Sequence, residues 1–178
     1  MPDAPGLELI AQELNDAHPG TVLATYHEHG EACLIVEPER VLDALGWLRD
    51  TPGQEYTFLS SLHGADYLPA EPRFGVIYEL LCMARVERIR IRAAVPDTGD
   101  ELENIPEMPS ATEIFPGAEF PEREVYDFFG INFTGHPDMR RILMPEDYVG
   151  WPQRRDFPVG GEPVIFTHNE RETPGWYR

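Results

Sequence analysis

The sequence predicts an α+β domain with a mostly antiparallel sheet, helices packed on one face of that sheet, and an extended C-terminal tail. Two observations carry this prediction. Segments with helical and strand patterns follow one another in the order α-β-β-α-β-β-β, which favours an antiparallel α+β arrangement. Prolines then crowd the C-terminal part of the chain. We place the domain at residues 1–130 and the tail at residues 131–178.

The first fifty residues predict a helix, a hairpin and a second helix. Apolar residues at helical spacing indicate an amphipathic helix over residues 7–17. Two β-rich segments, residues 21–29 and 32–37, are separated by His-Gly-Glu, which is typical of a hairpin. A second apolar face predicts a helix over residues 39–49, and the Thr-Pro-Gly that follows ends it.

The middle of the chain predicts three strands, at residues 56–62, 74–83 and 86–95. In the last of these, isoleucines alternate with arginines, so one face of the sheet points into the core and the other faces water or a partner. The arginine row consists of Arg88, Arg90 and Arg92. We interpret it as a solvated face, with contact to an acidic loop or to another chain as the alternatives.

A short charged helix is expected over residues 121–129, because Pro121 suits a first helical turn and Gly130 suits a C-terminal cap. The capping-box spacing from Ser110 to Glu113 predicts another short helix, ending near Pro116-Gly117. On the charged helix, Val125, Phe128 and Phe129 form an apolar arc that anchors it to the sheet. Glu122 and Glu124 flank the arc, and Arg123 and Asp127 lie together at i, i+4 on the opposite side.

Three interpretations of these charges compete. A general acid/base pair is disfavoured, because Glu122 and Glu124 point to opposite flanks and no nucleophile or metal cluster accompanies them. The charges are otherwise an ordinary solvated face, or they form partner-facing or inter-element ion pairs that fix where the tail leaves the domain. In the partner-facing case, replacing Arg123 or Asp127 with Ala is expected to weaken subunit association more than it unfolds the domain.

The tail combines six prolines between residues 137 and 174 with seven aromatic residues from Phe133 onward. The prolines forbid a long helix, yet disordered tails are poor in aromatics. We therefore expect the tail to lie extended over a surface, either of its own domain or of a partner subunit. His136 lies in a predicted tight turn, and Arg140-Arg141 supplies a basic patch suited to carboxylates. The predicted partner interface consists of Glu122, Arg123, Glu124, Asp127, His136, Arg140, Arg141 and Trp151.

Composition excludes several function classes. The net charge of −18 argues against nucleic acid and anionic lipid as partners. No apolar run approaches the roughly 18 residues needed to span a bilayer, and the first residues do not resemble a secretory signal. We therefore expect a cytoplasmic chain without direct membrane insertion. Cys33 and Cys82 cannot supply the about four thiolates of an iron–sulfur cluster, and there is no phosphate-binding glycine motif.

The run from Glu122 to Leu143 reads Glu-Arg-Glu-x-x-Asp-x-Phe-Gly-Ile-x-Phe-x-Gly-His-Pro-Asp-Met-Arg-Arg-Ile-Leu. It resembles the hallmark run of the 30-kDa subunit family of respiratory complex I, which in bacteria is the family of the C subunit of NADH-quinone oxidoreductase. Supporting similarity extends upstream through residues 56–67, 72–78 and 109–117, so the resemblance covers residues 55 to 158.

The resemblance implies a non-catalytic subunit of the peripheral arm of a proton-translocating NADH-quinone oxidoreductase. Such a subunit holds no cofactor and packs against the 49-kDa-type subunit (the D subunit), where it positions the quinone-site subunits. FMN and iron–sulfur clusters in partner subunits carry the electrons from NADH. The expected location is the cytoplasmic side of the cell membrane, peripheral through those partners.

Two other functions remain open at this point. Homologous subunits of membrane-bound hydrogenases and of ferredoxin- or F420-linked energy-converting complexes share the same run. A free-standing binding protein is the third alternative.

Overall fold

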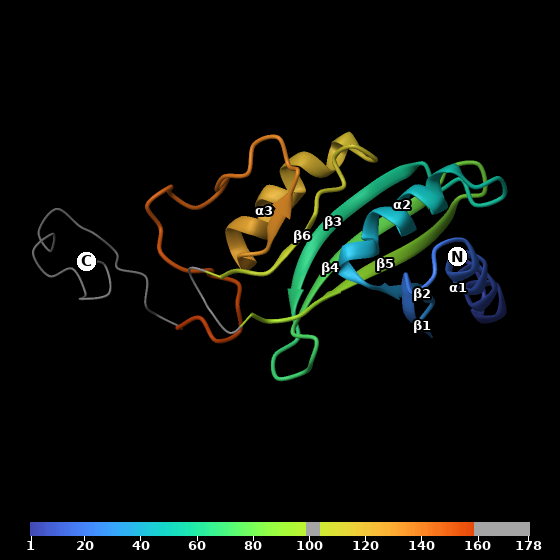
Figure 1. Ribbon diagram of the computed structural model, residues 1–178, viewed down its shortest axis with the longest axis horizontal. Helices are drawn as coiled ribbons and strands as arrows, with labels where there is room; N and C mark the ends of the chain where they lie inside the picture. Colours follow the sequence, from blue (N-terminus) through green and yellow to red (C-terminus); the bar gives the residue numbers. More distant parts are fainter. Residues whose placement is uncertain (99–103, 159–178) are drawn as a thin grey trace, which may run out of the picture.

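A five-stranded sheet forms the centre of the protein, in a computed structural model that describes residues 1–98 and 104–158 (Figure 1). The strand order is β1-β2-β5-β4-β3. Neighbouring strands run antiparallel except β2 and β5, which are parallel. The strands are β1 (Val22–Glu28), β2 (Glu31–Val36), β3 (Phe58–Asp66), β4 (Phe74–Cys82) and β5 (Glu87–Val95). The mostly antiparallel α+β fold is confirmed.

Three α-helices cover one face of the sheet. They are α1 (Ala4–Ala17), α2 (Val41–Asp50) and α3 (Glu119–Phe129). Their buried apolar residues join one core with alternate residues of the strands, such as Tyr78 and Leu80 of β4 and Ile91 of β5. Alternate residues of a strand point to opposite faces, so all three helices pack on the same side, as predicted.

Helix α1 begins three residues earlier than its apolar spacing predicts. The Asp3 side chain accepts a hydrogen bond from the Gly6 amide at 2.8 Å, and Pro5 lies in the first turn. An Asp N-cap followed by proline is a strong helix start. The apolar pattern alone misses this first turn because it carries no core residue.

The arginine row lies on the sheet face opposite the core, but it is not simply solvated. Arg90 of β5 donates to Glu79 of β4 at 2.5 Å and also pairs with Glu31 of β2. The Arg92 guanidinium stacks on the Tyr67 ring, 3.8 Å from its centroid. Cross-strand ion pairs of this kind tie three neighbouring strands together on this face.

The prediction of a helix that begins at Ser110 and ends near Pro116-Gly117 is wrong. Residues 112–114 form a turn, followed by a short 3₁₀-helix, η2 (Pro116–Ala118). The Ser110 hydroxyl donates to the Glu122 carboxylate at 2.6 Å instead of capping a helix that continues through Glu113. The Glu122 carboxylate is a strong hydrogen-bond acceptor, and its bond to Ser110 replaces the capping contact that the sequence predicts.

The packed part of the chain continues beyond residue 130. Strand β7 (Asn132–Thr134) pairs in parallel with β6 (Glu107–Pro109), and its Phe133 is buried. Residues 135–158 then contain no helix or strand, in line with the predicted tail. They run around α3 and return to the end of the sheet near the β3–β4 connection (Figure 1). Phe166, Trp176 and Tyr177, assigned to the tail, lie outside the described residues.

None of the helices in the described ranges is long and apolar enough to cross a bilayer.

Candidate functional site

Asp127 of α3 is the centre of the junction between that helix and the tail. Its carboxylate is fully buried. One oxygen accepts hydrogen bonds from three consecutive backbone amides, those of Ile142, Leu143 and Met144, at 3.1, 2.7 and 2.8 Å. The other accepts from the Arg141 guanidinium at 2.7 Å. We call residues 139–149, which wrap around this carboxylate, the junction loop.

The donors around Asp127 keep it ionised. Burial alone raises the pKa of this carboxyl, but the Met144 amide, the Arg141 guanidinium and the two further amides outweigh burial and lower it. The carboxylate is thus charged at neutral pH, and each of these donors belongs to the junction loop.

Arg123 and Arg141 complete the junction with backbone contacts. Arg123 donates to the carbonyl oxygens of Arg140 and Arg141 at 3.1 and 3.0 Å. Arg141 also donates to the carbonyls of Asp127 and Gly150, at 2.9 and 2.8 Å. The sequence predicted Arg123 and Asp127 side by side on one face. In the structure each engages a different part of the junction loop, which is the arrangement expected of inter-element contacts that fix where the tail leaves.

Glu122 and Glu124 occupy opposite environments. Glu122 is fully buried, where it accepts from the Ser110 hydroxyl at 2.6 Å and the Ala111 amide at 2.7 Å. Burial raises its pKa, and these donors only partly counteract that rise. Glu124 is exposed. One buried and one exposed carboxylate do not share a site, so the geometry offers no acid/base pair.

His136 and Arg140 lie at the surface end of the junction. The Nδ1 of His136 accepts from the Asp138 amide at 3.0 Å, and its Nε2 lies 2.8 Å from the Glu119 carbonyl. These contacts fit the imidazole tautomer with its proton on Nε2, and they fix the turn that enters the junction loop. Arg140 pairs with Asp138 at 2.9 Å and remains largely exposed.

Trp151 packs back onto α3 and is only 6 % exposed. Its ring meets Tyr126 edge-on at 5.4 Å, and the Arg141 guanidinium lies 4.7 Å from its centroid. The ring also covers Gly130, which ends α3 with a φ of +66°. A Cβ at Gly130 would lie 2.3 Å from the ring. Glycine is required here both for the left-handed backbone and for the approach of the ring.

Gly130→Ala is therefore expected to lower the free energy of unfolding by about 1–3 kcal/mol, through overpacking and left-handed strain. Urea denaturation of the purified chain measures this change. Gly117→Ala is the matched control, because a Cβ there meets nothing within 4 Å. Equal stability of the two variants would contradict the packing described for Trp151.

A second buried cluster holds the far end of the described tail. Arg73, at the start of β4, makes a two-point contact with Asp66 and also pairs with Asp97 and Asp156, at 2.8 and 2.6 Å. Asp66 in turn accepts from the Arg155 amide at 2.8 Å. Arg73 and Asp66 are nearly inaccessible to solvent. The tail is thus fixed at α3 and again at the β3–β4 connection.

Sequence reasoning missed this second cluster. Its bonded partners are separated by up to 89 residues, and an isolated Arg or Asp carries no pattern that marks it as buried. The cluster forms only when the fold brings the tail back to the sheet; its four residues are Asp66, Arg73, Asp97 and Asp156.

The junction loop presents apolar side chains to solvent. Leu143 is 61 % exposed, and Ile142 and Val149 are also exposed, as is Phe120 of α3. The backbone amides of residues 142–144 turn inward to Asp127, whereas the side chains of Ile142 and Leu143 are exposed. Among the described residues, no group of three His, Cys, Asp or Glu side chains is placed to hold a metal ion. Exposed apolar patches are typical of surfaces that contact other molecules.

Comparison with known proteins identifies the family of this chain. Residues 34–163 match the family described as the 30-kDa subunit of the respiratory-chain NADH dehydrogenase. The chain belongs to this family. That match includes the whole of α3, the junction loop and the Arg73 cluster, so both buried ionic groups lie within the family's shared region. The resemblance seen in the sequence is confirmed.

Two relatives of the 30-kDa family illustrate the similarity. A protein from Herpetosiphon aurantiacus, named as the C subunit of NADH-quinone oxidoreductase, is 48 % identical over 143 residues, which is 80 % of each chain. One of the same name from Roseiflexus castenholzii is 45 % identical over 161 residues, covering 90 % of this chain and 89 % of the relative.

Proposed function

We propose that the chain is a non-catalytic peripheral-arm subunit of a proton-translocating NADH-quinone oxidoreductase, in which it positions the subunits at the quinone site. One observation carries the proposal: the charged residues of α3 are used to hold the junction loop in place, with its apolar side chains outward. Relatives named as subunits of NADH-quinone oxidoreductase support the same assignment.

The proposed partner of the junction loop is the 49-kDa-type subunit. The predicted interface residues take different places on this view. Arg123, Asp127 and Arg141 hold the loop from inside. Glu122 is buried against Ser110 and Ala111, His136 fixes the turn before the loop, and Trp151 packs on α3. Glu124, Arg140 and the exposed apolar residue Leu143 are placed to face the partner. A rigid loop loses little conformational entropy on docking, which favours association.

We further propose that the chain binds no cofactor, and that FMN and iron–sulfur clusters reside in partner subunits. Cys33 is buried, and burial raises its pKa to about 11, which disfavours the thiolate that ligates iron. Cys82 is buried as well. The proposed location is the cytoplasmic side of the cell membrane, where the chain is held through its partners. The strongly acidic composition supports attachment through protein rather than through anionic lipid.

Purification of the tagged chain from native membranes tests the assignment. We expect a 49-kDa-type subunit and an NADH- and flavin-binding subunit to be recovered with it, together with NADH:quinone activity. Recovery with membrane subunits and a hydrogenase or a ferredoxin- or F420-linked module would favour the alternative complexes. A chain that is recovered alone would contradict the assembly role.

Leu143→Asp tests the junction loop within the same purification. A charge at the centre of an apolar contact is expected to lower recovery of the 49-kDa-type subunit by about ten-fold or more. Met83→Asp is the control, since Met83 is 63 % exposed in the β4–β5 turn, away from the loop. Equal recovery with the two variants would remove the junction loop from the interface.

A further inference from the structure

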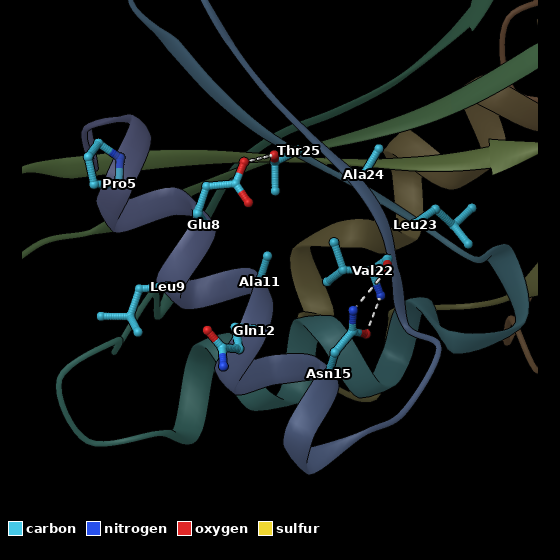
Figure 2. Close-up of a pocket in the computed structure, with 10 residues that line it drawn as sticks. All are labelled: Pro5, Glu8, Leu9, Ala11, Gln12, Asn15, Val22, Leu23, Ala24 and Thr25. Carbon is cyan, nitrogen blue, oxygen red and sulfur yellow. Dashed lines mark hydrogen bonds between the residues drawn. The ribbon is translucent and has the colours of Figure 1, made fainter.

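A hollow of about 700 Å³ opens between α1 and the edge strand β1, away from the α3 junction (Figure 2). Hydrogen bonds between the helix and the strand bound it at both ends. At one end the Thr25 hydroxyl donates to the Glu8 carboxylate. At the other, the Asn15 side chain donates to the Val22 carbonyl at 3.0 Å and accepts from the Val22 amide at 2.8 Å. We call this hollow the α1–β1 groove.

The groove has the length of a short extended peptide. Glu8 and Asn15 are seven positions apart on α1, which corresponds to about 10 Å at 1.5 Å per residue. An extended chain covers that distance in about three residues. Between the hydrogen bonds at its two ends, the helix contributes the small side chain of Ala11 (Figure 2). This small side chain leaves room for a side chain of a bound peptide.

The strand side of the α1–β1 groove is the edge of the sheet. Strand β1 is the last strand of the sheet and pairs only with β2 among the described strands. Asn15 already bonds both backbone groups of Val22, as a neighbouring strand would. An edge strand beside a helix is the arrangement in which peptides bind by adding a strand, with main-chain hydrogen bonds for affinity and a side-chain pocket for specificity.

Charge and apolar surface indicate what such a peptide carries. The first 39 residues contain no Lys or Arg. Glu8 and Gln12 line the groove, and Asp16 follows one turn after Gln12 on α1. Leu9 on α1 and Leu23 on β1, 55 % and 54 % exposed, lie at the outer rims of the groove, with side chains that point outward (Figure 2). The surface is complementary to a segment that combines basic and apolar residues, and it repels nucleic acid and anionic lipid.

We propose that the α1–β1 groove binds an extended segment of a neighbouring subunit, with an apolar side chain against Ala11 and Lys or Arg side chains beside Glu8 and Asp16. The proposal rests on the proposed function only in naming another subunit as the source of the segment. It adds a second docking surface, at the opposite end of the sheet from α3.

Site-specific photo-cross-linking tests the groove in the intact assembly. The photoreactive residue p-benzoylphenylalanine replaces Leu23, and the assembly is purified through a tag on this chain before illumination. We expect mass spectrometry to identify a cross-linked peptide of another subunit that contains Lys or Arg. The same residue at Met83 serves as the control position and is expected to give no cross-link to that peptide.

A pair of charge variants at Gln12 tests the electrostatic part. Gln12→Arg is expected to lower the Leu23 cross-link yield by about ten-fold, whereas Gln12→Glu preserves it. Both residues are good helix formers at an exposed position, so α1 is retained in each variant.

The outcomes separate this proposal from the proposed function. An intact assembly without a Leu23 cross-link, a cross-linked peptide lacking basic residues, or equal yields for the two Gln12 variants would each overturn the groove proposal alone. A chain that purifies without other subunits would overturn both.

Discussion

Asp127→Ala is expected to lower the free energy of unfolding of the chain by about 3–5 kcal/mol, the cost typical of breaking a buried ion pair from one side. The substitution leaves the Arg141 guanidinium without its carboxylate and three inward-facing amides, those of residues 142–144, without their acceptor. Buried donors without partners are costly because they also lose their contacts with water. Urea denaturation followed by circular dichroism measures the loss.

Glu124→Ala is the matched control for this experiment, since Glu124 is an exposed acid on the same helix. Its stability is expected to remain near that of the unchanged chain. If the two variants lost equal stability, the buried role of Asp127 would be refuted. The sequence alone placed the larger effect of Asp127 on subunit association. Because the carboxylate is buried within the chain, the structure shifts the expected effect to the stability of the chain itself.

The same variant has a defined pH dependence. The folded chain lowers the pKa of Asp127, so its contribution to stability is complete above the ordinary aspartate pKa of about 4 and is lost as pH falls through the folded value. The stability difference between the unchanged chain and Asp127→Ala is therefore expected to shrink below about pH 4. A difference that stayed constant down to the acid transition would contradict an ionised Asp127.

The contribution of Glu122 to stability has the opposite pH dependence. Its pKa is raised in the folded chain, so its contribution is complete below the ordinary glutamate value and is lost as pH rises through the folded value. Comparing the two chains at each pH isolates Asp127, because Glu122 is present in both.

Arg73→Met is the second substitution with a large expected effect, about 3–5 kcal/mol of unfolding free energy. It removes the cation that pairs with three aspartates, of which Asp66 is almost inaccessible to solvent. Methionine keeps most of the apolar stem, so the loss reports the charge and its hydrogen bonds rather than a cavity. Asp66 would then be a buried carboxylate without its guanidinium.

Release of the tail gives this prediction a second measurement. Because Asp156 and the Arg155 amide are held by the cluster, trypsin is expected to cleave after Arg155 faster in Arg73→Met than in the unchanged chain. Arg40→Met is the control, since Arg40 forms an exposed pair with Asp43. Unchanged cleavage in Arg73→Met, with the fold intact, would show that the cluster does not fix the tail.

The sequence predicted the regular elements well because their signals are local. Alternation in residues 86–95 placed Ile89 and Ile91 in the core and the arginines on the other face, as the structure has them. Helix α3 ends at Gly130 as its glycine cap predicts. Strands β6 and β7 were missed, because three residues are too few to establish a period of two.

The site was less predictable because its contacts are not local. On a helical wheel, Arg123 and Asp127 fall on a charged side that is either solvated or engaged in partner-facing or inter-element pairs. The wheel alone does not decide between these, and in the structure the returning tail buries both residues. The aromatic content of the tail correctly indicated a covering role. In the described part Trp151 and Phe133 cover the chain's own domain, while the aliphatic Leu143 and Val149 remain outward.

Asp127 fixes the backbone of the junction loop through hydrogen bonds that do not involve the side chains of residues 142–144. At positions 142–144 the carboxylate accepts hydrogen bonds from main-chain N–H groups. Every residue type except proline supplies such a group. The hydrogen bonds to Asp127 therefore fix the course of the backbone at these three positions without using the side chains that it displays.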